Sequence, residues 1–84
     1  MPDKEILKKQ IIYRSIHRGT KEMDLLLGEF VKKNINSFNL NELKELEYLV
    51  DTEDTILEKW YFNKITTKQI PVNKVSKLLK IFKI

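Results

Sequence analysis

Glycine and proline, the residues that most often interrupt helices, are rare in this chain, which has two of each among 84 residues. Apolar residues recur every three or four positions, and no segment alternates polar and apolar side chains for long, which is typical of amphipathic helices. A chain of this length, taken here as one domain over 1–84, buries a little over ~60% of its unfolded surface. The sequence therefore predicts an all-α fold, a compact antiparallel bundle of about five short helices.

The first two expected helices carry apolar faces of different clarity. The second ends in the polar stretch 34–37 and has five apolar residues at the i, i+3, i+4, i+7, i+8 spacing: Met23, Leu26, Leu27, Phe30 and Val31. The first, over about 3–18, places four apolar residues on one broad side: Leu7, Ile11, Ile12 and Ile16. We expect both faces to lie in the core.

Helix-start signals position the other three helices. Asn39, followed three residues later by Glu42, resembles a capping box and opens a helix with core positions Leu43, Leu46, Leu49 and Val50. Asp51 or Thr52 is expected to cap a fourth helix that carries Ile56, Leu57, Trp60 and Tyr61. Pro71 suits the first turn of a fifth, whose apolar stripe is Val72, Val75, Leu79 and Phe82, with Leu78 and Ile81 beside it.

The stretch YRSIHRGTKEMDLL, at 13–26, contains the end of the first helix and the start of the second. Arg14 and Arg18 lie four residues apart, so they share a face in the last turn, where cations complement the helix dipole. Gly19 can adopt the left-handed conformation that ends a helix without steric cost. This turn therefore gathers two arginines beside a residue without a side chain.

The start of the second helix adds carboxylates to the same turn. Thr20 is expected to cap this helix, with Glu22 and Asp24 in a first turn that favours acids. Helix-end physics alone selects such residues, so a purely structural role is one interpretation. The other is that this charged corner binds another protein.

The residue types exclude several function classes. The chain has no cysteine, one histidine, and no Ser-His-Asp grouping, phosphate-cradling glycine loop or dinucleotide fingerprint. We therefore expect neither an enzyme nor a metal site, and we expect His17 to lie on the surface. Trp60, a lone tryptophan, is expected to anchor the core. Glu53 and Asp54 are assigned mainly to helix-start effects, with partner contact as the alternative.

Charge is divided along the chain. Residues 42–58 hold seven acids and one lysine, whereas residues 59–84 hold seven lysines and no acid, within a net charge of +4. One interpretation is attraction between the third or fourth helix and the fifth. Nucleic-acid binding by the lysine-rich tail is another, but the tail has no arginine for bidentate base recognition and its apolar stripe is needed by the bundle. A peripheral membrane role is disfavoured because the helix is short and shares in the core.

Two motifs resemble one known family, over about residues 6–80. RSIHRGTKEMDLLLGEF contains the signature RGxxExD of the SdhE, or succinate dehydrogenase assembly factor 2, family, filled here by Arg18, Gly19, Glu22 and Asp24. LVDTEDTILEKW, at 49–60, is similar to the family's later segment, in which an acidic run and a leucine precede a tryptophan: Glu53, Asp54, Leu57 and Trp60. The chain departs from the family pattern at His17, Thr55 and Ile56.

The resemblance implies a helical assembly factor or chaperone, not an enzyme. Its implied partner is the flavoprotein subunit of succinate dehydrogenase, with the fumarate reductase flavoprotein as a second candidate. FAD would become covalently attached to a histidine of the partner, while this chain would hold no cofactor stably by itself. The implied partner-binding residues are Arg14, His17, Arg18, Gly19, Glu22 and Asp24.

The resemblance also bears on where the protein works. No apolar run approaches the roughly 18 residues that span a bilayer, and the start MPDKEILKK is not an Arg-rich, acid-poor mitochondrial leader. We therefore expect a bacterial cytoplasmic protein or an already processed chain, a monomer when free and without nucleic-acid or membrane partners. The absence of cysteine fits a reducing compartment. A small basic helical nucleic-acid-binding protein is the alternative function.

Overall fold

The computed structural model describes residues 4–17 and 20–83, and in these ranges the regular structure is helical. The elements are α1 (Lys4–Ile16), α2 (Lys21–Asn34), a short 3₁₀ helix (Ile35–Ser37), α3 (Leu40–Val50), α4 (Asp54–Tyr61) and α5 (Lys74–Ile81). The predicted all-α fold with five short helices is thus confirmed. None of the described helices is long and apolar enough to cross a membrane.

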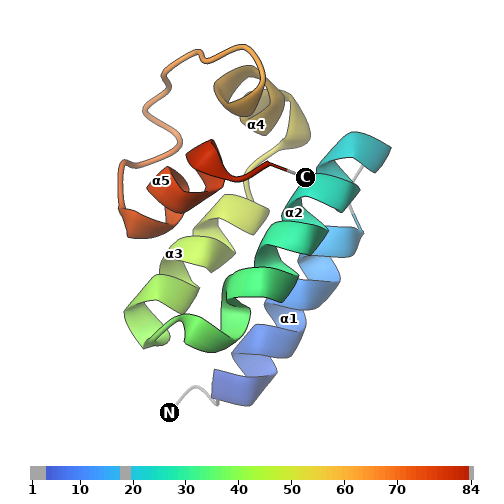
Figure 1. Cartoon of the computed structure of the whole chain (residues 1–84), viewed down its shortest axis with the longest axis vertical. Helices are drawn as coiled ribbons and strands as arrows, with labels where there is room; N and C mark the ends of the chain where they lie inside the picture. Colours follow the sequence, from blue (N-terminus) through green and yellow to red (C-terminus); the bar gives the residue numbers. More distant parts are fainter. Residues whose placement is uncertain (1–3, 18–19, 84) are drawn as a thin grey trace.

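The first three helices run in alternating directions, and the last two cover one side and one end of them (Figure 1). α1 packs against α2 and α3, and α5 packs against α3. α4 lies across the end of the bundle where α2 begins (Figure 1). This arrangement brings the end of α1, the start of α2 and the junction between α3 and α4 to the same region of the molecule.

The apolar faces predicted for α2 and α3 are confirmed. All nine of their predicted core side chains are at most 2% exposed: Met23, Leu26, Leu27, Phe30, Val31, Leu43, Leu46, Leu49 and Val50. α3 also begins as predicted, because the Asn39 side chain accepts from the Glu42 backbone amide and the Glu42 carboxylate accepts from the Asn39 amide, both at 2.9 Å. Leu57 and Trp60 of α4 are buried as well, so the expectation that Trp60 anchors the core is confirmed.

The face predicted for α1 is wrong in part. Leu7 and Ile11 are buried, but Ile12 and Ile16 are 41% and 49% exposed. The third buried position is Ser15, whose hydroxyl donates to the carbonyl of Ile12 at 2.7 Å. The buried stripe therefore follows an i, i+4, i+8 line of Leu7, Ile11 and Ser15. Serine can occupy a buried position here because its hydroxyl is satisfied by a backbone carbonyl of the same helix.

The predicted starts of α4 and α5 are also wrong. Thr52 does not cap α4, since its hydroxyl donates to the carbonyl of Tyr48 in α3, and Asp51 is the C-cap of α3. The N-cap of α4 is instead Glu53, whose side chain makes no capping hydrogen bond. α5 begins at Lys74, after Asn73, which forms a capping box with Ser76.

The late start of α5 changes which of its apolar residues are buried. Val75 and Leu79 are buried as predicted, and Leu78 and Phe82 pack partly buried against the core. Val72 precedes the helix and is 79% exposed, so its predicted place in the stripe is wrong. Ile81 is 74% exposed at the helix end. The expected attraction between α3 and α5 is confirmed, because the Lys74 ammonium lies 2.7 Å from the Glu42 carboxylate.

Candidate functional site

A shallow pocket of about 430 Å³ lies at the corner where α1 ends and the α3–α4 junction passes beside it. α1 and the residue after it contribute Tyr13, Arg14 and His17. The junction contributes the segment 50–54, whose acids are Asp51, Glu53 and Asp54. We call this the corner pocket. It combines aromatic, cationic and anionic groups in one small region of the surface.

Arg14 organises the corner pocket from α1. Its Nη1 atom donates to Glu47 Oε2 at 3.0 Å and to Asp51 Oδ2 at 3.3 Å, while its side chain is 39% exposed. One guanidinium thus joins the last turn of α1 to the end of α3. Because these contacts fix the position of the α3 end, Arg14 holds the acidic junction beside α1.

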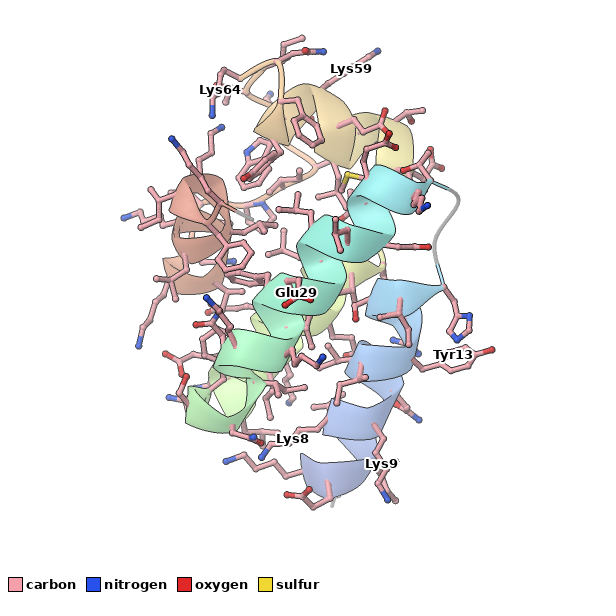
Figure 2. All side chains as sticks on the ribbon, turned by 45° about the vertical axis from the view of Figure 1, so that its right-hand side comes forward. Lys8, Lys9, Tyr13, Glu29, Lys59 and Lys64 are labelled. Carbon is pink, nitrogen blue, oxygen red and sulfur yellow. The ribbon has the colours of Figure 1, made fainter. Side chains whose placement is uncertain are left out.

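Tyr13 and His17 form the outer wall of the pocket. They are four residues apart, and their ring centroids lie 4.0 Å apart with an interplanar angle of 31°. Tyr13 is 63% exposed and points outward from α1, away from α2 (Figure 2). The expectation of a surface position for His17 is confirmed. Exposed paired rings provide apolar contact area with a polar edge, which suits a protein interface.

The start of α2 is tied to α4 beside this pocket. Thr20 is the N-cap of α2, as predicted, and its hydroxyl oxygen accepts from the Met23 amide at 3.3 Å. The same hydroxyl donates to Glu58 Oε1 at 3.4 Å. Glu22 and Asp24 occupy the first turn of α2, as predicted, with Glu22 exposed and Asp24 half-buried.

The six predicted partner-binding residues are therefore not gathered in one pocket. Arg14 and His17 line the corner pocket, whereas Asp24 lines a separate groove between α1 and α2. Arg18 and Gly19 lie outside the described residues. The partner-binding role of all six stays a prediction.

The groove between α1 and α2 is a feature that the sequence did not predict. It has a volume of about 740 Å³, and its apolar lining includes Ile12, Ile16 and Leu25, each 41–52% exposed. Gly28 lies in its wall, where an added Cβ would approach Ile16 Cγ2 to 3.1 Å. The groove faces the viewer in Figure 2, beside the labelled Glu29 of α2. A lone glycine inside a helical pattern was the available signal, since it often marks a close approach of another element.

Tyr13 was likewise not predicted as part of the site, and for Glu53 partner contact was only the alternative to a helix-start role. Glu53 was assigned mainly to the start of α4, but its carboxylate makes no capping bond and lines the corner pocket instead. No local pattern places residue 13 beside residue 53, because that proximity depends on how α1 packs on α3.

Comparison with known proteins identifies the family of the chain. Residues 9–83 match the family model described as flavinator of succinate dehydrogenase. The chain belongs to this flavinator family. The match includes all of the corner pocket and nearly all of the five helices.

Individual relatives agree with the family assignment. The chain is 38% identical over 78 residues to the mitochondrial succinate dehydrogenase assembly factor 2 of Scheffersomyces stipitis, covering 92% of this chain and 52% of that protein. It is 30% identical over 73 residues to the FAD assembly factor SdhE of Acetobacter pasteurianus, covering 87% and 64%. The chain thus spans between half and two thirds of the length of these two relatives. No solved structure matches the chain significantly.

The fold brings together the two stretches that carry the family resemblance. Arg14 and His17 come from the first, Tyr13 immediately precedes it, and the segment 50–54 comes from the second. The hydrogen bond from Thr20 to Glu58 joins the same two stretches a second time. In this member of the flavinator family, the two stretches therefore lie in contact, although neither Glu22 nor Asp24 of the RGxxExD signature lines the corner pocket.

Proposed function

We propose that this protein is an assembly factor that binds the flavoprotein subunit of succinate dehydrogenase and promotes covalent attachment of FAD to it. The observation that carries the proposal is the exposed pocket in which Arg14 and His17, just before the RGxxExD signature, meet the acidic segment 50–54 of the second family stretch. The family description, flavinator of succinate dehydrogenase, supports this choice of client. The fumarate reductase flavoprotein is a second candidate client, because the same exposed pocket would serve it.

Docking would use those side chains of the corner pocket that do not stabilise the fold. Tyr13 and His17 would supply the apolar contact, and the Glu53 carboxylate would accept hydrogen bonds from basic or amide groups of the client. Glu22 lies exposed in the neighbouring first turn of α2 and would add a second acceptor. Arg14 is engaged by Glu47 and Asp51, so its main contribution would be to position the pocket.

The protein would act without catalytic groups or a cofactor of its own. By binding one conformer of the immature flavoprotein more tightly than the others, it would raise the population in which the flavin and the target histidine approach correctly. FAD would be held by the client throughout. A bacterial cytoplasmic location is part of the proposal; the Acetobacter relative supports the bacterial origin.

The experiment that tests this function measures both binding of the flavoprotein and its covalent FAD content. The tagged protein is used to capture the flavoprotein from cells, and in-gel flavin fluorescence then measures covalent FAD in the client with and without the factor. We expect Glu22→Ala to abolish stimulation of flavinylation while changing the free energy of unfolding by less than about 1 kcal/mol, because only a helix-dipole interaction is lost. Gly19→Arg should also abolish stimulation.

A purely structural role for the corner gives a different outcome. Glu22→Ala would then lower stimulation only in proportion to the folded fraction, which circular-dichroism melting measures. Tyr48→Ala is a matched control, since Tyr48 is an exposed tyrosine of α3 outside the corner pocket. Equal loss of activity in Glu22→Ala and Tyr48→Ala would reject the proposed docking surface.

A further inference from the structure

In the final third of the described chain, every charged side chain is positive. Residues 59–83 carry seven lysines and no acid. Two of the lysines have structural duties: Lys74 pairs with Glu42, and Lys80 donates to the Trp60 carbonyl at 3.3 Å with its Nζ 4.4 Å from the centre of the Trp60 ring. The other five are exposed: Lys59, Lys64, Lys68, Lys77 and Lys83. They give the segment 59–83 an excess of exposed positive charge, which attracts anionic partners.

Large apolar side chains project from among these lysines. Val72 and Ile81 are 79% and 74% exposed, the two highest values among the exposed large hydrophobic residues of the described chain. Phe62 and Ile65, just after α4, are each about half exposed. α5 is short and shares in the core through Val75 and Leu79, as the sequence predicted, but these four side chains lie outside the core and are free to contact a membrane.

The backbone presents these groups on the outside of the bundle. The segment 62–73 runs from α4 to the start of α5 along the edge of the molecule farthest from α1 (Figure 1). Lys59 and Lys64 lie at the α4 end of this edge (Figure 2). On α5, Lys74, Lys77 and Ile81 have i, i+3, i+7 spacing and so share the outer face, opposite the buried Val75 and Leu79.

We propose that this surface, made of the segment 62–73 and the outer face of α5, binds anionic lipid bilayers peripherally. Lysines attract the negative surface of such a membrane, and exposed aliphatic and phenyl side chains enter the boundary between headgroups and acyl chains. Charge attraction alone or insertion of a few apolar side chains alone binds a membrane weakly, but the two contributions add when they lie on one surface. The lack of arginine and the mainly aliphatic character of the wedge favour lipid over nucleic acid, which is bound through base stacking and Arg contacts.

The lipid surface is independent of the flavoprotein-docking function. α1, which carries Tyr13, lies on the other side of the bundle from α5 (Figures 1 and 2). A molecule adsorbed through α5 would therefore keep the corner pocket open to a client.

Vesicle co-sedimentation of the full chain tests the proposal. We expect binding to phosphatidylcholine vesicles that contain phosphatidylglycerol, little binding to phosphatidylcholine alone, and release at high salt because the charge attraction is screened. Lys68→Gln/Lys77→Gln should weaken binding about fivefold per lysine removed. Ile65→Ser/Val72→Ser, which keeps every charge, should weaken it about tenfold or more.

Control variants separate a loss of lipid contacts from a loss of fold. Leu25→Ser removes a half-exposed leucine from α2, in the groove outside this surface, and should leave vesicle binding unchanged. Circular-dichroism melting checks that each variant is folded, and flavinylation of a soluble client should be unaffected by the Ile65→Ser/Val72→Ser change.

Three results would overturn the inference. One is absence of binding to phosphatidylglycerol vesicles at low salt. Another is full binding by Ile65→Ser/Val72→Ser, which would indicate simple charge attraction without insertion. The third is tighter binding of duplex DNA than of vesicles, lost in Lys68→Gln/Lys77→Gln, which would identify a nucleic-acid surface instead.

Discussion

At the scale of single residues, Arg14 has a role that its position in the sequence did not specify. The sequence predicted a helix-end cation able to pair with a client carboxylate. In the fold its guanidinium contacts Glu47 and Asp51, which belong to α3 and its C-cap. Long-range ion pairs of this kind depend on how helices pack and cannot be read from local spacing.

Neutralising Arg14 and Glu53 one at a time distinguishes the residue that stabilises the corner from the residue that is available for docking. Arg14→Gln should lower the free energy of unfolding by about 0.5–1 kcal/mol, a modest loss because the pair is partly exposed and screened. Glu53→Gln should change it by less than about 0.5 kcal/mol, because this side chain makes no capping bond. Urea unfolding measures both values. A larger loss for Glu53→Gln than for Arg14→Gln would contradict these assignments.

The ionised Glu42 carboxylate makes the free energy of unfolding depend on pH in the acidic range. Its pKa is held below the ordinary value because the Lys74 ammonium and the Asn39 backbone amide bond the ionised form, which outweighs the opposing effect of burial. A lowered folded-state pKa means that the stabilisation is fully present above the unfolded pKa, about 4.3, and is lost as the pH falls through the folded value.

The test compares wild type with Glu42→Gln in urea across pH. We expect the variant to be less stable at pH 6–8 by a constant amount, and the difference to shrink as the pH falls below about 4. A difference that persists unchanged under strongly acidic conditions would show that the ionised carboxylate is not the stabilising form.

At the scale of elements, prediction succeeded where local signals agreed with packing. The capping box of α3 and the apolar faces of α2 and α3 could be predicted because periodicity and caps pointed to the same positions. For α5, Pro71 predicts a start that is too early, because Asn73 and Ser76 form the capping box that begins the helix. The spacing of that pair was visible in the sequence.

The end of α4 has no such sequence signal. Lys64 has a φ of 60°, and the Ile65 amide bonds the Lys59 carbonyl at 3.0 Å, so the chain closes the helix through a left-handed residue that is not glycine. A lysine in this conformation is strained relative to glycine by about 1 kcal/mol or more.

Replacing this lysine should therefore stabilise the fold. Lys64→Gly is expected to raise the free energy of unfolding by about 0.5 kcal/mol, the relief of strain being offset in part by the greater flexibility of glycine in the unfolded chain and by loss of the Lys64–Tyr61 ring contact. Lys68→Gly, in the same connecting segment, serves as the comparison in thermal melting. Destabilisation by Lys64→Gly would show that the left-handed conformation carries little strain.

At the scale of the whole molecule, the fold converts the division of charge in the sequence into separate surfaces. The acidic junction lies beside the end of α1, and the lysine-rich segment covers the opposite edge. The division itself was evident from the sequence, but the composition of the corner pocket was not. Tyr13 and Glu53 are 40 residues apart in the sequence, and only the packing of α1 on α3 brings their segments together.

The central claim is that the corner pocket, through exposed groups without a structural duty, drives flavinylation of a client. Its most direct test is the rate of covalent FAD incorporation into purified flavoprotein subunit, followed by in-gel flavin fluorescence, with wild type, Tyr13→Ala/His17→Ala or the control Tyr48→Ala added. The account predicts that the control stimulates as wild type does, while the corner variant, with an unchanged melting curve, does not. Full stimulation by the folded corner variant would contradict it.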